Sequence, residues 1–248
     1  MTRAHLLVAA LSLAMPAAGQ TPAAPLPDWS GVWVRPFEEF SGETDRWRNP
    51  KDPTSPPLSV RGEATRVATV KALLARGPQN DTNAPTAGTC AASAPGGMPQ
   101  VMRYAFGVEF LFTPGRVTIL LEQGSTIRRI FTDGRQHSAD PDATYTGESI
   151  GRWEGGTLVV DTRAIRAGTQ LTGGVPTSGE AHIVERIQRT DSRQMRIDTV
   201  VEDPAMLTAP WRYSRTYQRL DDRWFERACD NDRDGSDREP DLTPPAKP

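Results

Sequence analysis

The sequence predicts a mainly β protein, an antiparallel up-and-down β-barrel of about eight to ten strands. From Met102 onward, short runs with alternating polar and apolar residues follow one another with turn residues between them. No helical segments alternate with these runs, which disfavours a parallel α/β sheet. The 21 glycines and 22 prolines favour turns and strands over a helical bundle. Closing the strands into a barrel would leave no long exposed edge.

The predicted strands follow one another in hairpin order. Gly155-Gly156 is a two-residue hairpin signal between two of them. Alternation within a strand is clearest where Met195, Ile197 and Val201 lie opposite polar neighbours. The strands are expected at residues 29–35, 107–112, 116–122, 126–131, 148–154, 157–162, 180–189, 194–202, 211–219 and 223–228.

The first part of the domain, residues 36–100, is predicted to be an irregular and helical insertion. Residues 36–57 are polar and interrupted by prolines, which indicates a long loop. Leu58–Arg76 has apolar residues near helical spacing and ends at Gly77-Pro78, so one amphipathic helix is expected there.

The N-terminal segment indicates export. Residues 1–19 contain Arg3, an apolar run from Leu6 to Met15 and then small residues, as a secretory signal peptide does. The run is shorter than the ~20 residues that a membrane-spanning helix needs, so the protein is expected to be periplasmic or secreted and not membrane-spanning. A linker at 20–28, a single barrel domain at 29–229 and a polar disordered tail at 230–248 complete the predicted organisation.

Export gives the two cysteines a meaning. Cys90 and Cys229 are an even pair in an oxidising compartment, which predicts a disulfide. Nothing basic flanks Cys90, so a catalytic thiol is disfavoured.

Charge and composition narrow the partners. The formal net charge is −2 with both signs interspersed, so the sequence has no basic stripe for nucleic acid. A monomer that takes a small-molecule ligand or substrate, without a cofactor, is the expectation.

The stretch Thr132–Thr162 is the first place to look for a site. His137 lies there among acidic residues, and a carboxylate beside an imidazole raises its basicity and fixes its tautomer. Asp133 or Asp142 is the expected partner, with Tyr145 and His182 completing a candidate catalytic set. Arg103 or Arg135 would stabilise an anion.

A second set of residues is predicted to line a ligand pocket inside the barrel. His182 and Arg186 share one face of their strand and would project inward if Ile183 and Ile187 mark the outer face. Aromatic residues on the strands would supply apolar surface, although such residues are often plain core. The predicted ligand-binding residues are Arg103, Arg135, Trp153, Arg186, Trp33 and Tyr213.

Three other motifs are weak. Gly147-Glu148-Ser149-Ile150-Gly151 matches a G-x-S-x-G nucleophile elbow, but the strand-to-helix context of that motif is missing. Asp230–Asp241 has the opening of a calcium loop without a following helix, so a solvated tail is favoured. Two histidines with one carboxylate could form a zinc site, yet the spacing is unlike known zinc motifs and no metal is expected.

Several blocks carry a resemblance. SGVW, TPGRV, IFTDGRQH, SIGRWEGGTLVVDT, HIVERIQR and EDPAMLTAPW are similar to those of an uncharacterised family of exported bacterial proteins. The resemblance implies an exported, single-domain protein and implies no activity. Gly31-Val32-Trp33 is similar to the G-x-W of lipocalin-like barrels, which agrees with the antiparallel strand count.

Three functions are compatible with these observations. The first is an exported barrel that binds a small, mostly apolar or aromatic molecule. The second is a cofactor-independent acid/base enzyme, a lyase, isomerase or hydratase acting on a hydroxylated or aromatic metabolite in the same pocket. The third is an envelope interaction domain.

Overall fold

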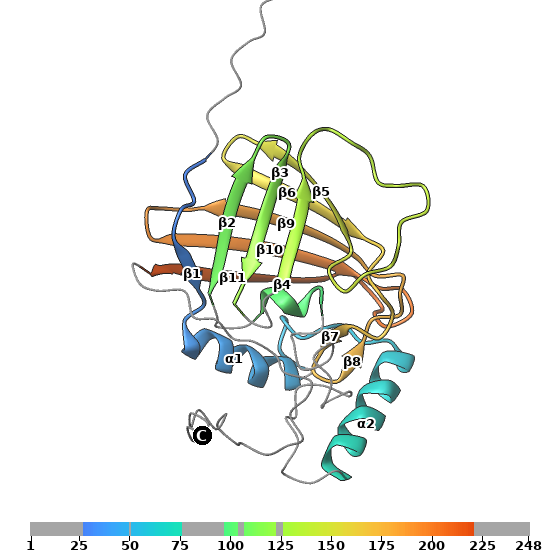
Figure 1. Cartoon of the computed structure of the whole chain (residues 1–248). Helices are drawn as coiled ribbons and strands as arrows, with labels where there is room; N and C mark the ends of the chain where they lie inside the picture. The colour runs from blue at the N-terminus through green and yellow to red at the C-terminus, as the bar shows by residue number, and fades with distance from the viewer. Residues whose placement is uncertain (1–26, 50, 76–96, 104–106, 123–125, 221–248) are drawn as a thin grey trace, which may run out of the picture.

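The computed structural model describes residues 27–49, 51–75, 97–103, 107–122 and 126–220. Nine strands of this part close into a barrel in the order β1–β11–β10–β9–β6–β5–β4–β3–β2 (Figure 1). The prediction of a mainly β protein built on a barrel is confirmed. The barrel strands are β1 (Val32–Val34), β2 (Val108–Thr113), β3 (Arg116–Leu121), β4 (Thr126–Phe131), β5 (Glu148–Glu154), β6 (Thr157–Arg163), β9 (His182–Arg189), β10 (Gln194–Glu202) and β11 (Trp211–Leu220).

One junction of the barrel differs from an up-and-down arrangement, because β4 and β5 run parallel. Residues 132–147 carry the chain back along the outside of the barrel before β5 begins (Figure 1). Only Ile130 with Ser149 and Phe131 with Ile150 are paired at this junction. The first part of β4, residues 126–129, therefore has no paired residue on β5. All other neighbours in the barrel are antiparallel.

Two helices lie below one end of the barrel (Figure 1). Helix α1 (Phe37–Arg48) occupies most of the segment that the sequence predicted to be a loop. It has acidic Glu38 and Glu39 in its first turn, where negative charge favours helix formation. Helix α2 (Val60–Ala75) confirms the predicted helix, and the Ser59 hydroxyl caps it by accepting the Gly62 N–H at 3.0 Å.

The remaining elements are short. A 3-10 turn, η1 (Gln100–Met102), packs beneath the barrel, and its residues are buried. Strands β7 (Gln170–Thr172) and β8 (Val175–Pro176) form a separate two-stranded sheet, built from the part of the chain that connects β6 to β9. No helix in the described ranges is long and apolar enough to cross a membrane.

The barrel interior is filled by its own side chains. Inward residues from all the barrel strands form one core that includes Trp33, Ile119, Leu158 and Tyr217, each at most 1% exposed. The described interior side chains are thus packed against one another and nearly inaccessible to solvent.

Several sequence expectations fall outside the described residues. The signal segment 1–19, Cys90, Cys229, the strand at 223–228 and the tail at 230–248 are among them, as is most of the linker at 20–28. The disulfide stays a prediction.

Candidate functional site

The two histidines of the barrel domain meet at one carboxylate on the outer wall. His137 Nε2 lies 2.9 Å from Asp161 Oδ1, and His182 Nε2 lies 2.9 Å from Asp161 Oδ2. The three residues come from the 132–147 loop, β6 and β9, so the contact joins segments that are far apart in the sequence.

Each histidine has a second carboxylate at its other ring nitrogen. His137 Nδ1 lies 2.7 Å from Glu148 Oε2, and His182 Nδ1 lies 3.2 Å from Glu202 Oε2. The result is an imidazole–carboxylate row, Glu148–His137–Asp161–His182–Glu202, that crosses the outer faces of β5, β6, β9 and β10.

The hydrogen bonds of the row depend on the charge of its groups. A carboxylate only accepts hydrogen bonds, and a neutral imidazole donates at one nitrogen only. Both carboxylate contacts of one histidine are therefore hydrogen bonds only when that histidine is an imidazolium. Arg163 also contacts Asp161 at 3.2 Å. Two imidazolium groups and one guanidinium would balance the three carboxylates of the row.

The electrostatics of the carboxylates agree with this arrangement. Partial burial raises the pKa of Asp161, but hydrogen bonds from His182 and His137 and the charge of Arg163 outweigh it, so its pKa lies below the ordinary value. The Ser138 hydroxyl hydrogen bond is the largest cause of the lowered pKa of Glu148, and His137 adds to it. The row favours ionised carboxylates.

Strand alternation places these side chains outside the barrel. Leu158, Val160 and Thr162 of β6 point inward and are buried, so Asp161 between them points out. On β9, Ile183 and Ile187 are fully buried, so His182 and Arg186 lie on the outer face. The inward placement that was considered for His182 and Arg186 is therefore wrong, because the apolar side chains take the interior.

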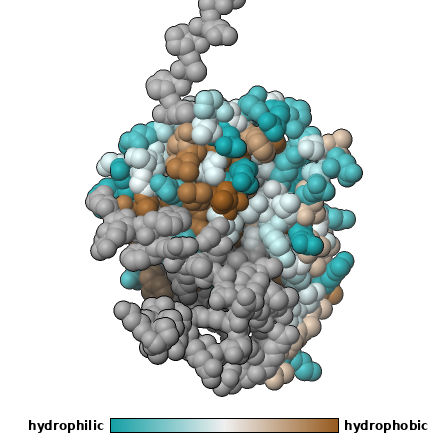
Figure 2. All heavy atoms as spheres, in the orientation of Figure 1, coloured by the Kyte–Doolittle hydropathy of each residue, from teal (hydrophilic) through white to brown (hydrophobic). Residues whose placement is uncertain are grey.

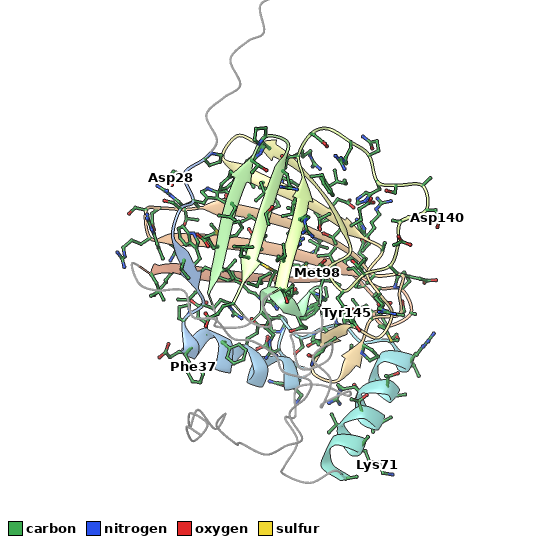
Figure 3. All side chains as sticks on the ribbon, in the orientation of Figure 1. Asp28, Phe37, Lys71, Met98, Asp140 and Tyr145 are labelled. Carbon is green, nitrogen blue, oxygen red and sulfur yellow. The ribbon has the colours of Figure 1, made fainter. Side chains whose placement is uncertain are left out.

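A hollow of about 460 Å³ lies next to the row, where β4 and the chain before β5 separate. The end of the 132–147 loop is anchored to segments other than β4: the Tyr145 carbonyl accepts the Met98 N–H, and the Thr144 carbonyl accepts the Arg166 N–H. Figure 3 shows Asp140 on the outer arch of this loop, away from the barrel wall. The hollow is lined by Ile127, Arg129, Phe131, Ser138, Asp140, Pro141, Asp142, Thr144, Thr146, Gly147, Glu148 and Ser149.

Apolar side chains continue from this hollow across the neighbouring strands. Ile127 is 45% exposed and Leu111, on β2, is 41% exposed. Leu120 on β3 is paired with Ile127 and is half-buried. Figure 2 shows the resulting apolar patch on the face that carries β2 to β4. The strand wall of the hollow is thus partly apolar.

A second hollow, of about 350 Å³, lies at the other side of the row. It is lined by Arg163, Ala164, Gly179, Glu180, Ala181 and His182. Glu148 belongs to the first hollow and His182 to the second, so the row connects the two.

Asp133 or Asp142 was the predicted carboxylate partner of His137, and neither of them contacts it. Asp133 pairs with Arg135 within the same turn, at 2.6 Å, and its side chain is exposed. Asp142 lines the hollow and makes no hydrogen bond to His137. Tyr145 stacks with the Arg166 guanidinium at 5.4 Å and has no contact with His137 among the described interactions. The actual partners come from β5 and β6.

The predicted ligand-binding residues are scattered. Arg135 lies over the Phe131 ring at 3.9 Å, beside the hollow, whereas Arg186 pairs with Glu154 on the outer wall at 2.8 Å. Trp33 is fully buried, Trp153 packs on Trp29 at 5.4 Å, and Tyr213 is a core residue whose burial raises its pKa to about 12. These three aromatic residues build the core.

Arg103 belongs to a different cluster, which the sequence analysis missed. Its Nε lies 3.2 Å from Glu43 of α1, and the same carboxylate contacts Arg35 at 2.7 Å and Arg215 at 3.2 Å. All four residues are buried. The sequence contained one indication of this cluster: Arg215 shares its strand face with Trp211 and Tyr217, which are typical core residues.

A second buried ion pair crosses the barrel interior. Arg128 Nη2 lies 2.5 Å from Glu185 Oε2 and 3.0 Å from the Thr162 hydroxyl. Ser149 is 1% exposed and hydrogen-bonds to Thr162 at 2.9 Å. The serine of the G-x-S-x-G match is thus part of the interior and is not an exposed nucleophile.

Within the described ranges, no three His, Cys, Asp or Glu side chains are placed to hold a metal ion.

Replacing Asp161 with Asn should release the 132–147 loop from the wall. A carboxylate has an acceptor oxygen for each histidine, whereas an amide offers one acceptor and one donor group, so it cannot keep both of these contacts as an acceptor. The Ser138 amide, which donates to Glu148 at 3.0 Å, should then exchange its hydrogen about tenfold faster. Hydrogen exchange followed by mass spectrometry measures this. Asp133→Asn is the matched control and should leave exchange at Ser138 unchanged; equal exchange in both variants would show that Asp161 does not anchor the loop.

Comparison with family models, curated proteins and solved structures finds no match to this chain.

Proposed function

We propose that the protein is an exported β-barrel that binds a small, partly apolar molecule in the hollow between β4 and the 132–147 loop. The observation that carries the proposal is this hollow of about 460 Å³, whose walls include the exposed side chain of Ile127 and the half-buried side chains of Phe131 and Pro141. Its size lies within the usual range of small-molecule sites, roughly 300 to 1,000 Å³.

The hollow replaces the barrel interior as the proposed pocket. The interior side chains are packed against one another and nearly inaccessible, while the outer hollow is open and has convergent polar groups at Ser138 and Glu148. A periplasmic or secreted location rests on the apolar N-terminal segment and on the resemblance of the GRWEGGTLVVDT block to exported bacterial proteins.

Native mass spectrometry of the purified protein tests the proposal. The wild-type protein should carry a bound small molecule, and Ile127→Trp should lose it because the larger side chain occupies the hollow. Leu111→Trp is the matched control, since Leu111 is similarly exposed on the outer face of β2 but does not line the hollow. A molecule retained by Ile127→Trp, or lost equally from both variants, would argue against the hollow.

An acid/base enzyme is the second candidate, and the imidazole–carboxylate row favours it. Carboxylates beside an imidazole are typical of general acid/base sites. However, both ring nitrogens of His137 are engaged, so a hydrogen bond must break before a proton reaches a substrate. Because His137 also anchors the loop, His137→Ala should lower stability as well as any turnover. The binding function therefore takes precedence.

A further inference from the structure

The hollow contains three charged side chains that have no partner in the described part of the chain. Arg129 is on the strand wall, and Asp140 and Asp142 are on the loop wall. None of the three forms a hydrogen bond or ion pair with another described residue, whereas Glu148, also in the lining, is held by Ser138 and His137.

These unpaired charges have opposite signs on opposite walls. Ile127 and Phe131 lie on the same strand wall as Arg129, at the alternate positions that face outward. A molecule between the walls would meet a guanidinium on one side, carboxylates on the other and apolar surface along β4.

The strand edge adds backbone groups to this list. Residues 126–129 of β4 have no paired residue on β5, so part of their N–H and C=O groups faces the hollow instead of a neighbouring strand. A sheet edge of this kind pairs with the extended backbone of another chain.

We propose that the hollow binds a short peptide with free termini and an apolar side chain. The peptide carboxylate would contact Arg129, its ammonium group would contact Asp140 and Asp142, and its amide would pair with the β4 edge. Two or three extended residues measure about 7 to 10 Å at about 3.3 Å per residue, and the volume of about 460 Å³ lies within the range of small-molecule sites. The inference rests on the proposed function, because it names the ligand class of the same hollow.

Calorimetric titration with a dipeptide and its blocked forms tests the inference. The probes are Leu-Phe, N-acetyl-Leu-Phe, Leu-Phe amide and the doubly blocked dipeptide. Each blocked terminus should weaken binding about tenfold, as expected for the loss of one charged contact. Equal affinities for all four probes, or no binding of any of them at millimolar concentration, would overturn the inference.

Variants assign each terminus to its wall. In Arg129→Gln, Leu-Phe amide and Leu-Phe should bind equally, while acetylation should still weaken binding. In the double variant Asp140→Asn/Asp142→Asn, N-acetyl-Leu-Phe and Leu-Phe should bind equally, while amidation should still weaken binding. Arg212→Gln is the control, because Arg212 is an exposed arginine of β11 outside the hollow. Unchanged discrimination in both hollow variants would overturn the assignment.

The outcome also separates this inference from the proposed function. If the native ligand is lost in Ile127→Trp but no dipeptide binds, the hollow is a binding site for another class of molecule and only the peptide inference fails. If the Ile127→Trp variant retains the native ligand and also still binds the dipeptides, neither molecule occupies this hollow, and both the proposed function and the peptide inference fail.

Discussion

Replacing Glu43 with Gln is expected to lower the free energy of unfolding by at least about 3 kcal/mol. The Glu43 carboxylate is 3% exposed and contacts three buried guanidinium groups, those of Arg35, Arg103 and Arg215. Removing one partner of a buried ion pair leaves an uncompensated charge, which costs about 3–5 kcal/mol. Here the lost charge serves three cations, so the upper part of that range is expected.

The same carboxylate predicts a loss of stability in acid. Burial raises the pKa of Glu43, but the charges of Arg215, Arg35 and Arg103 outweigh it, and the pKa lies below its ordinary value of 4.5. A carboxyl whose pKa is lower in the folded state stabilises the fold above the unfolded-state value. Its contribution is therefore complete above about pH 4.5 and is lost as the pH falls through the folded-state pKa.

Urea unfolding at neutral pH and in acid measures both effects. Glu39→Gln is the matched control, because Glu39 is an exposed residue of the same helix. The control should change stability by less than about 1 kcal/mol, the usual contribution of a first-turn carboxylate. A Glu43→Gln protein as stable as this control would show that the three arginines do not depend on Glu43.

The strands could be predicted because their physical signal is local. The predicted strands at 126–131, 148–154 and 194–202 have the same bounds as β4, β5 and β10. Period-2 alternation and turn residues are read from neighbouring positions, and the buried face of each strand follows from them. Strand direction leaves no such mark, so the parallel β4–β5 junction was not foreseen.

Helix α1 was missed because its buried contact is electrostatic. Its sequence, FEEFSGETDRWR, has no apolar stripe at helical spacing. The side chain that fixes it to the barrel is Glu43, whose partners lie directly after β1, directly after η1 and on β11. A helix whose anchor is a carboxylate surrounded by distant arginines resembles a polar loop when its sequence is considered alone.

Only part of the candidate site could be predicted, because its contacts join segments that are distant in the sequence. His137 and His182 were identified by residue type, but their shared partner Asp161 depends on the register of β6 with β9, which pairs Asp161 with Val184. One residue of slip would reverse the face of every side chain on the strand. The hollow likewise depends on where the 132–147 loop is anchored, which residue spacing does not encode.

Removing either partner of the Arg128–Glu185 pair should be as damaging as the loss of Glu43. The side chains of Arg128 and Glu185 are 0% and 1% exposed and their atoms approach to 2.5 Å. Arg128→Met or Glu185→Leu alone leaves the other charge in the apolar interior, and each should cost about 3–5 kcal/mol.

The double variant Arg128→Met/Glu185→Leu should recover most of that loss. Two ions removed from water carry a desolvation cost that their attraction only partly offsets, and Arg128 Nη1 is buried without a hydrogen-bond partner among the described residues. The attraction between Arg128 and Glu185 therefore does not fully offset their desolvation cost. Apolar side chains of similar volume should replace the pair with a net change in the free energy of unfolding of about 1 kcal/mol or less. Urea unfolding of the two single variants and the double variant completes the double-mutant cycle. A double variant that is less stable than both single variants would mean that the interior depends on the ion pair itself, together with its hydrogen bonds to Ser149 and Thr162.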